Sequence, residues 1–365
     1  MTSLGLRALN RATLDRQLLL RRRPLTAQQA VRHLAGLQGQ APLAPYVGLW
    51  TRLSRFAPEN LSNLLSERTV VRAALMRGTV HVADAEDFAA FRPLFSPLLA
   101  GVLGTSFRRN LAAADLTELA RYAGELLAGR PLTSAEIGRA LAPRWPDADP
   151  MALAYAATYL VPVVHVPPRG IWGRSAQATF AEAGSWLATP MADARPDAVD
   201  QLVLRYLAAF GPATVADVQT WAGLTRLREV TDRLQLRHLR GPDGLELVDL
   251  PDAVLPDEDT PAPPRFLPEY DNLLLSYADR RRVIPHDRQP PLWPGNGATQ
   301  GTILIDGEWN ALWKITRTPG GPVLAVTPFR ALTAPEEAGV AEEGTRLLAF
   351  MSPGATPDIR FLPPL

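Results

Sequence analysis

Apolar residues recur at helical spacing in three separate parts of the chain, at residues 6–20, 116–127 and 199–210. After each run comes a proline, a threonine two residues later and a polar residue three positions after the threonine, in the stretches 24–31, 131–138 and 212–219. A threonine followed three residues on by Gln, Glu or Asp is typical of a capped helix start. The pattern therefore predicts three pairs of helices in tandem.

Each helix pair is followed by another helical stretch and then by a β-branched segment with Gly or Pro turns, at residues 69–84, 163–180 and 236–250. Helices followed by a hairpin are the order of a winged helix, in which a β-hairpin extends a helix-turn-helix. We predict an α+β protein with three tandem winged-helix units, at residues 1–110, 111–195 and 196–255.

A linker rich in proline and aspartate, residues 251–264, separates these units from the C-terminal part. Residues 265–365 contain strand-like runs and turns, with Asp306–Gly307 marking one hairpin. This pattern favours a small antiparallel barrel or sheet at the C-terminal end.

The 365 residues include no cysteine and only five scattered histidines, so the sequence predicts no disulfide, no metal centre and no cofactor. Arginines interrupt the apolar residues near the N-terminus, and no window approaches the 18 apolar residues of a membrane helix. We expect a cytoplasmic protein without membrane contact. Residues 1–110 hold fifteen arginines against six acidic residues, which suits contact with a polyanion or only reflects composition.

The absence of a P-loop, of a Rossmann GxGxxG after a strand and of a GxSxG elbow argues against nucleotide hydrolysis, dinucleotide binding and the usual esterase chemistry. Lys314 is the one lysine of the chain, so covalent imine chemistry is not expected either.

The remaining candidates are Gln38 and Gln40, on either side of Gly39. Thr26 is predicted to cap a helix that Gly39 ends before Pro42. Residues two apart in an extended segment point to the same side, so both amides are expected to face one place. The alternative is that they only satisfy backbone groups at a helix end.

The sequence resembles one protein family along the whole chain. The stretches that carry the resemblance are HLAGLQGQAPLAPYVGLWTRL, VVRAALMRGTVHVADAEDF, FLPEYDNLLLSYADR and DGEWNALWK. They are similar to the tandem winged-helix DNA glycosylases of bacteria typified by AlkZ and YcaQ. The resemblance implies three winged-helix units, a C-terminal β-barrel and catalysis by Gln38 and Gln40, which match the Gln-x-Gln of the AlkZ branch. That branch includes self-resistance enzymes that remove bulky adducts or unhook interstrand crosslinks formed by alkylating antibiotics.

Neutral amides suit such a reaction because alkylation at purine N7 leaves a cationic base that departs with little acid catalysis. The amides then have only to hold a water against the sugar. We therefore expect a monofunctional glycosylase without lyase activity, acting as a monomer on double-stranded DNA with alkylated purines.

Further site residues are less specific in sequence. Arg21, Arg22 and Arg23 are candidates for phosphate contacts or for a solvated charge run. Arg77, Thr79 and His81 are candidates for DNA contact, because Thr79 and His81 alternate on one face of a strand that would place the hairpin against DNA. The alternatives are a wing strand with ordinary surface polar residues and, for His81, a hydrogen-bonded core histidine.

Tyr270 and Asp271 belong to the family-like segment. Asp271 either supports the glutamines or caps the helix that begins near Asn272.

Two other functions fit the predicted fold. A winged-helix transcription regulator would bind DNA without catalysis, although three unequal units in one chain do not readily present two-fold recognition helices. A scaffold is supported only by the linker and by the acidic remainder of the chain, where 31 acidic residues face 23 basic ones.

Overall fold

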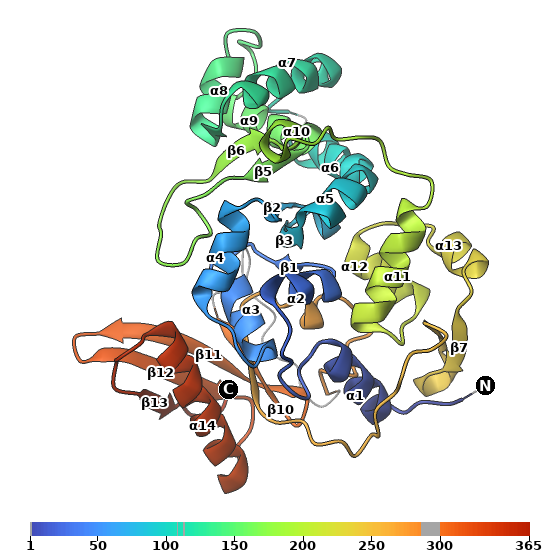
Figure 1. The fold of residues 1–365 in the computed structure, drawn as a ribbon, viewed down its shortest axis with the longest axis vertical. Coiled ribbons are helices and arrows are strands. Elements are labelled where there is room, and N and C mark those ends of the chain that lie inside the picture. Colours follow the sequence, from blue (N-terminus) through green and yellow to red (C-terminus); the bar gives the residue numbers. More distant parts are fainter. Residues whose placement is uncertain (1, 108, 112–113, 286–299) are drawn as a thin grey trace.

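The computed structural model describes residues 2–107, 109–111, 114–285 and 300–365. Figure 1 shows the N-terminal unit (blue) in the middle of the molecule, with the second unit above it and the third beside it. The C-terminal sheet (orange to red) lies at the lower left. The first unit therefore contacts all the other parts of the chain.

The order helix, strand, helix, helix and hairpin occurs three times. In the first unit these elements are α2 (Ala27–His33), β1 (Leu37–Gln38), α3 (Ala44–Arg52), α4 (Pro58–Ser66), β2 (Val70–Ala74) and β3 (Val80–Asp84). In the second they are α7 (Leu116–Gly129), β4 (Leu132–Thr133), α8 (Ser134–Leu141), α9 (Pro150–Leu160), β5 (Val163–His165) and β6 (Thr179–Glu182), followed by α10 (Ala183–Leu187).

In the third unit a single bridge between Ala213 and Val248 takes the place of the first strand. Its other elements are α11 (Ala198–Phe210), α12 (Val215–Ala222), α13 (Arg228–Arg233), β7 (Arg237–Arg240), the 3₁₀ turn η4 (Pro242–Gly244) and β8 (Glu246–Asp249).

All three predicted helix starts are confirmed. Thr26, Thr133 and Thr214 each cap a helix in a capping box whose second member is Gln29, Glu136 or Asp217. Thr26 opens the helix that precedes the first strand of its unit, however, whereas Thr133 and Thr214 open the helix that follows the first strand or bridge of theirs. The first strand of the N-terminal unit, Leu37–Gln38, consequently follows the helix that Thr26 caps, whereas Leu132–Thr133 precedes the helix that Thr133 caps.

The hairpins of the first two units join into one sheet, with strand order β1-β3-β2-β5-β6-β4. The join is a pairing of Arg72 with His165. Amphipathic patterns did not predict this join, because the pattern of one strand does not specify which edge it will meet. The third hairpin forms a separate two-stranded sheet of β7 and β8.

The C-terminal strands form an open sheet and not the barrel that the resemblance implied. Its order is β13-β12-β11-β10-β9, and among the described residues β13 and β9 are its edges. α14 (Ala334–Met351) packs on this sheet and buries Leu347 and Leu348. The strands are β9 (Arg265–Leu267), β10 (Gly301–Ile305), β11 (Glu308–Thr318), β12 (Gly321–Pro328) and β13 (Asp358–Phe361).

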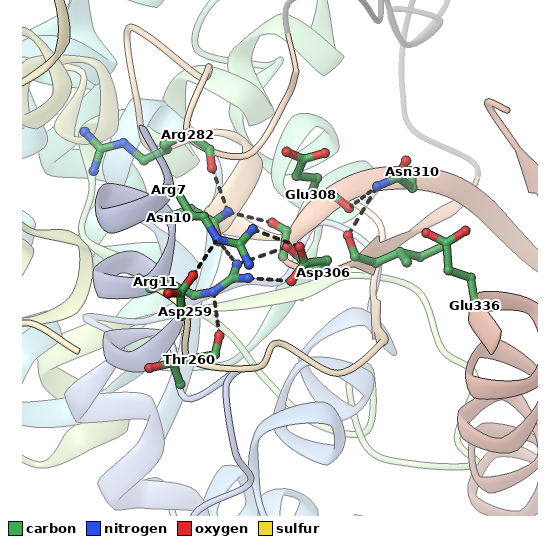
Figure 2. A network of polar contacts seen from close by, with 12 residues as sticks. Arg7, Asn10, Arg11, Asp259, Thr260, Arg282, Asp306, Glu308, Asn310 and Glu336 are labelled. Atoms are coloured by element: carbon green, nitrogen blue, oxygen red, sulfur yellow. Dashed lines mark hydrogen bonds and ion pairs between the residues drawn. The ribbon is translucent and has the colours of Figure 1, made fainter. Parts of the chain in front are cut away.

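The predicted hairpin turn at Asp306–Gly307 is confirmed, with φ of 47° and 81°. The N-terminal helix α1 (Leu6–Arg16) holds this turn (Figure 2). Asn10 Nδ2 donates to the carbonyl oxygens of Gly307 at 2.8 Å and of Arg282 at 2.7 Å, and Arg11 pairs with Asp306. The two ends of the chain are thereby tied together.

One stretch, Ala85–Thr105, is long and apolar enough to cross a membrane by length and composition, contrary to our expectation that no window comes close. Its side chains Phe88, Phe95, Leu99 and Leu103 are buried in the hydrophobic cores of the protein. The chain there is divided among α5 (Ala85–Phe91), η2 (Arg92–Phe95), α6 (Ser96–Val102) and η3 (Leu103–Phe107).

Candidate active site

Gln38 and Gln40 lie where the first unit turns from a helix into the edge strand of the six-stranded sheet. α2 ends at His33, and Ala35 and Gly36 reverse the chain with φ of 53° and 93°. We had expected Gly39 to end this helix, but the residue that ends it is Gly36. Leu37–Gln38 already pairs with β3.

Gly39 packs closely on the neighbouring strand. Its N–H donates to the Val80 carbonyl at 2.8 Å, and a Cβ added to it would lie 3.3 Å from Val82 Cγ2. A side chain at this position would therefore point toward β3. Gln40 is exposed, whereas Gln38 is only 7% exposed.

Arg77 contacts Gln38 directly. Its Nη2 donates to Gln38 Oε1 at 2.8 Å and to Asn272 Oδ1 at 2.9 Å, and its Nη1 donates to the Trp221 carbonyl at 2.7 Å. Burial lowers the pKa of Arg77 to about 10, and no acidic group forms an ion pair with it in the described part of the chain. We expected Arg77 to contact DNA, but these three bonds turn its guanidinium into the protein.

His81 is fully buried beside the glutamine. It pairs across the strands with Gln38, so the two side chains lie on the same face of the sheet. Its Nδ1 donates to the Thr79 carbonyl at 2.9 Å, while Nε2 has no hydrogen-bond partner among the described groups, although Asn272 lies beside the ring. Burial and the charge of Arg77 lower the His81 pKa to about 3.

His81 is therefore neutral at physiological pH and does not present its ring to the surface. This is the core histidine that we gave as the alternative to a DNA contact. Thr79, half-buried, uses its hydroxyl to donate to the Met76 carbonyl at 3.1 Å within the hairpin turn.

Arg72 approaches the same segment from β2, and no sequence pattern pointed to it. Its Nε and Nη2 donate to the Gly39 carbonyl at 3.2 and 2.7 Å, and its Nη1 lies 3.4 Å from His165 Nδ1. The side chain is 3% exposed, and burial, together with the charge of Arg169, lowers its pKa to about 10.

Asp271 is paired with Arg52 and makes no hydrogen bond to either glutamine among the described residues. Its two carboxylate oxygens accept from Arg52 Nη1 and Nη2, each at 2.9 Å, in an ion pair whose side chains are 1% and 2% exposed. Asp271 also accepts from the Leu273 N–H and caps the 3₁₀ turn η5 (Asn272–Leu274), as we predicted in the alternative. The next residue, Asn272, is the one that reaches the site, and no motif in the sequence had marked it as a candidate.

Tyr270, beside these residues, is half-buried and has a φ of 61°, which is unusual for a bulky side chain. The chain is thus sharply turned before η5. After this turn Asn272 contacts Arg77, while Asp271 pairs with Arg52.

The three consecutive arginines have different surroundings. Arg22 pairs with Glu343 and lies over the Trp50 ring at 4.6 Å, and Arg23 pairs with Asp15 at 2.8 Å. Only Arg21 is exposed. Among the described residues no group of three His, Asp or Glu side chains is placed to hold a metal ion.

Comparison with known proteins now identifies the fold and the family. A family model described as "DNA glycosylase AlkZ-like" matches residues 31–350. The chain belongs to the AlkZ-like DNA glycosylase family. The matched part contains Gln38, Gln40, Arg72, Arg77 and Asn272, so the whole cluster described above lies within the family region.

The DNA glycosylase AlkZ of Streptomyces sahachiroi has a similar solved structure, with a TM-score of 0.83 and 20% sequence identity. The alignment covers 99% of this chain and 100% of that one. The AlkZ-like fold therefore extends over the entire chain, including the open C-terminal sheet. No curated protein matches the sequence. Membership of this family favours the enzyme over the transcription regulator and the scaffold.

Proposed function

We propose that this DNA glycosylase is monofunctional and hydrolyses the N-glycosidic bond of N7-alkylated purines, including bulky adducts or interstrand crosslinks left by an alkylating natural product. The observation that carries the proposal is the Gln38–Gln40 pair, with the Gln40 side chain exposed and the Gln38 amide held from inside by Arg77. AlkZ itself, named as a DNA glycosylase, has the same fold.

The charges around the pair support a reaction that needs no strong acid. His81 is neutral with a pKa of about 3, and the carboxylate of Asp271 is occupied by Arg52. An alkylated purine carries its own positive charge, so its bond to the sugar is already weakened and the base leaves without protonation by the enzyme. The amides then orient the attacking water as positive charge develops on the sugar.

Hydrolysis without lyase activity follows from the scarcity of amines. A glycosylase that also cleaves the strand forms an imine with the sugar, which requires a positioned amine. Lys314, the one lysine of the chain, is exposed on β11 in the C-terminal sheet, outside the cluster around Gln38.

The test is base release from a panel of duplexes containing N7-methylguanine, a bulky N7 adduct, an N7-linked interstrand crosslink, or the neutral lesions uracil and hypoxanthine. We expect release of the cationic bases and no release of the neutral ones. Borohydride added during the reaction should trap no protein on the DNA. Release of the neutral lesions at equal rates, or a trapped complex, would contradict the proposed chemistry.

A further inference from the structure

Two arginines of one hairpin donate hydrogen bonds to the segment that carries the glutamines. Arg72, from β2, donates twice to the carbonyl oxygen of Gly39. Arg77, from the turn between β2 and β3, donates to the side-chain carbonyl of Gln38. One arginine therefore holds the main chain between the two amides, and the other holds one of the amides.

Neither arginine has a carboxylate partner among the described residues, although Arg52 nearby has one in Asp271. Carbonyl groups satisfy the hydrogen bonds of a guanidinium without neutralising its charge, and removing an unpaired ion from water has a free-energy cost. The lowered pKa values of Arg72 and Arg77 reflect this cost. Packing alone does not account for two charged side chains here, because an apolar side chain would fill the space at a lower cost.

Arg77 is itself fixed by other parts of the fold. Its backbone has a φ of 57°, and its guanidinium also bonds the Trp221 carbonyl of the third unit. Asn272 accepts from Arg77 and donates through Nδ2 to the Gly36 carbonyl at 3.3 Å, in the turn before Gln38. The position of the Gln38 amide is thus determined by three distant parts of the chain.

These contacts define the direction of the amide. Since an arginine only donates, the atom of Gln38 that faces Arg77 is the carbonyl oxygen, and the NH₂ group points away from it. A glutamine without such a partner turns its amide over freely, because the two ends are nearly the same size.

We propose that Arg72 and Arg77 are positioning residues of the reaction, which fix Gln38 with its NH₂ group toward the substrate and Gly39 with Gln40 directed to the same place. The proposal rests on the proposed glycosylase function. Gln38 then serves as the hydrogen-bond donor and leaves the acceptor role to the Gln40 carbonyl. A donor and an acceptor at fixed positions hold one water in one orientation, which two freely turning amides do not.

The first test is a double-mutant cycle with Gln38→Ala, Arg77→Met and the double variant, measured as single-turnover base release and as DNA affinity. Misplacing a reacting group by about 1 Å costs about 100-fold in rate, so we expect Arg77→Met to slow release by roughly 10- to 100-fold at unchanged affinity. In the Gln38→Ala background Arg77→Met should change little. Arg72→Met should likewise slow release, and Arg77→Lys should recover part of the rate.

The control is Arg360→Met, which removes the same charge from an exposed position on β13 and should leave release unchanged. Arg77→Met would weaken DNA binding without slowing release if Arg77 instead contacted a phosphate. Fully additive effects of Gln38→Ala and Arg77→Met would mean that Arg77 does not act through Gln38. Either result overturns the proposal.

A second measurement does not depend on activity. In protein labelled with ¹⁵N in glutamine side chains, the NH₂ signals of Gln38, assigned from Gln38→Ala, should move in Arg77→Met and stay in place in Arg360→Met. Unchanged Gln38 signals in Arg77→Met overturn the positioning claim even if the wild type releases no base. Failure of the wild type to release any base overturns the proposed function alone.

Discussion

At the scale of single residues, the buried Arg52 and Arg72 and the half-buried Arg77 have different electrostatic situations. Arg52 is neutralised by Asp271 through two bonds, whereas within the described parts of the chain Arg72 and Arg77 bond to neutral groups. Buried ion pairs lose stability when one partner is removed, because the other charge is left unpaired. We therefore expect Asp271 to act in the stability of the fold, and we propose that Arg77 acts in the geometry of the site.

Asp271→Asn should accordingly destabilise the protein by about 3–5 kcal/mol, because it leaves Arg52 charged and buried. Urea unfolding measures this loss. At a low temperature where the variant remains folded, its rate of base release should stay within a few-fold of wild type. Asp358→Asn, which removes an exposed carboxylate paired with Arg360, should leave stability nearly unchanged. A rate as low as that of Gln38→Ala would instead place Asp271 in catalysis.

Because His81 is buried and neutral, we expect the free energy of unfolding to fall in acid. Its pKa is lowered from 6.5 to about 3 in the folded protein, so between these values the unfolded chain binds more protons. Stability is thus complete above about pH 6.5 and falls with decreasing pH, by up to about 1.4 kcal/mol per pH unit for one histidine. His81→Asn should show a smaller fall between pH 7 and pH 5 in urea unfolding. The exposed His238→Asn serves as the control, and an equal fall in wild type and His81→Asn would contradict the burial argument.

The sequence predicted the candidates Gln38 and Gln40 but not the residues that hold them. Arg77 and Asn272 are 195 positions apart, and the contact depends on how the first unit packs against the segment after β9. Arg77 looked like a surface residue of a wing, because the pattern of a hairpin does not reveal that its turn will be covered by the third unit. The contacts of Arg77 and Asn272 therefore depend on packing between distant parts of the chain.

At the scale of elements, local signals were sufficient wherever the interaction is local. The capping boxes at Thr26, Thr133 and Thr214 and the turn at Asp306–Gly307 each need only residues within a few positions, and all four are confirmed. Strand pairing between units and closure of the C-terminal sheet depend on distant edges. The sequence therefore did not show that two hairpins join, or that the last sheet stays open.

The turn at Gly307 gives a test at this scale. Gly307 has a φ of 81°, and a Cβ there would lie 2.4 Å from Asn10 Oδ1. Gly307→Ala should lower the melting temperature, because it strains the turn and displaces α1 from the sheet. Gly320→Ala, where the nearest atom would be 3.8 Å away and no positive φ is required, should have little effect. Equal melting temperatures for the two variants would show that α1 does not depend on this contact.

At the scale of the whole molecule, the basic N-terminal third is partly neutralised within the fold. Arg22 and Arg23 are paired with Glu343 and Asp15, but Arg21 is exposed. DNA binding should weaken linearly in a plot of log affinity against log salt, as released counterions require. If Arg21 contacts a phosphate, Arg21→Ala should reduce the slope by about 0.9. An unchanged slope would remove Arg21 from the DNA interface.

The central claim is that Gln38 and Gln40 carry out hydrolysis on DNA that the rest of the fold binds. The most direct measurement is single-turnover release of N7-alkylguanine by wild type, Gln38→Ala and Gln40→Ala, with DNA affinity measured on the same duplex. We predict base release by the wild type, a loss on the order of 100-fold in each variant, and equal affinities for all three. Base release by the Gln38→Ala, Gln40→Ala double variant at the wild-type rate would contradict the account.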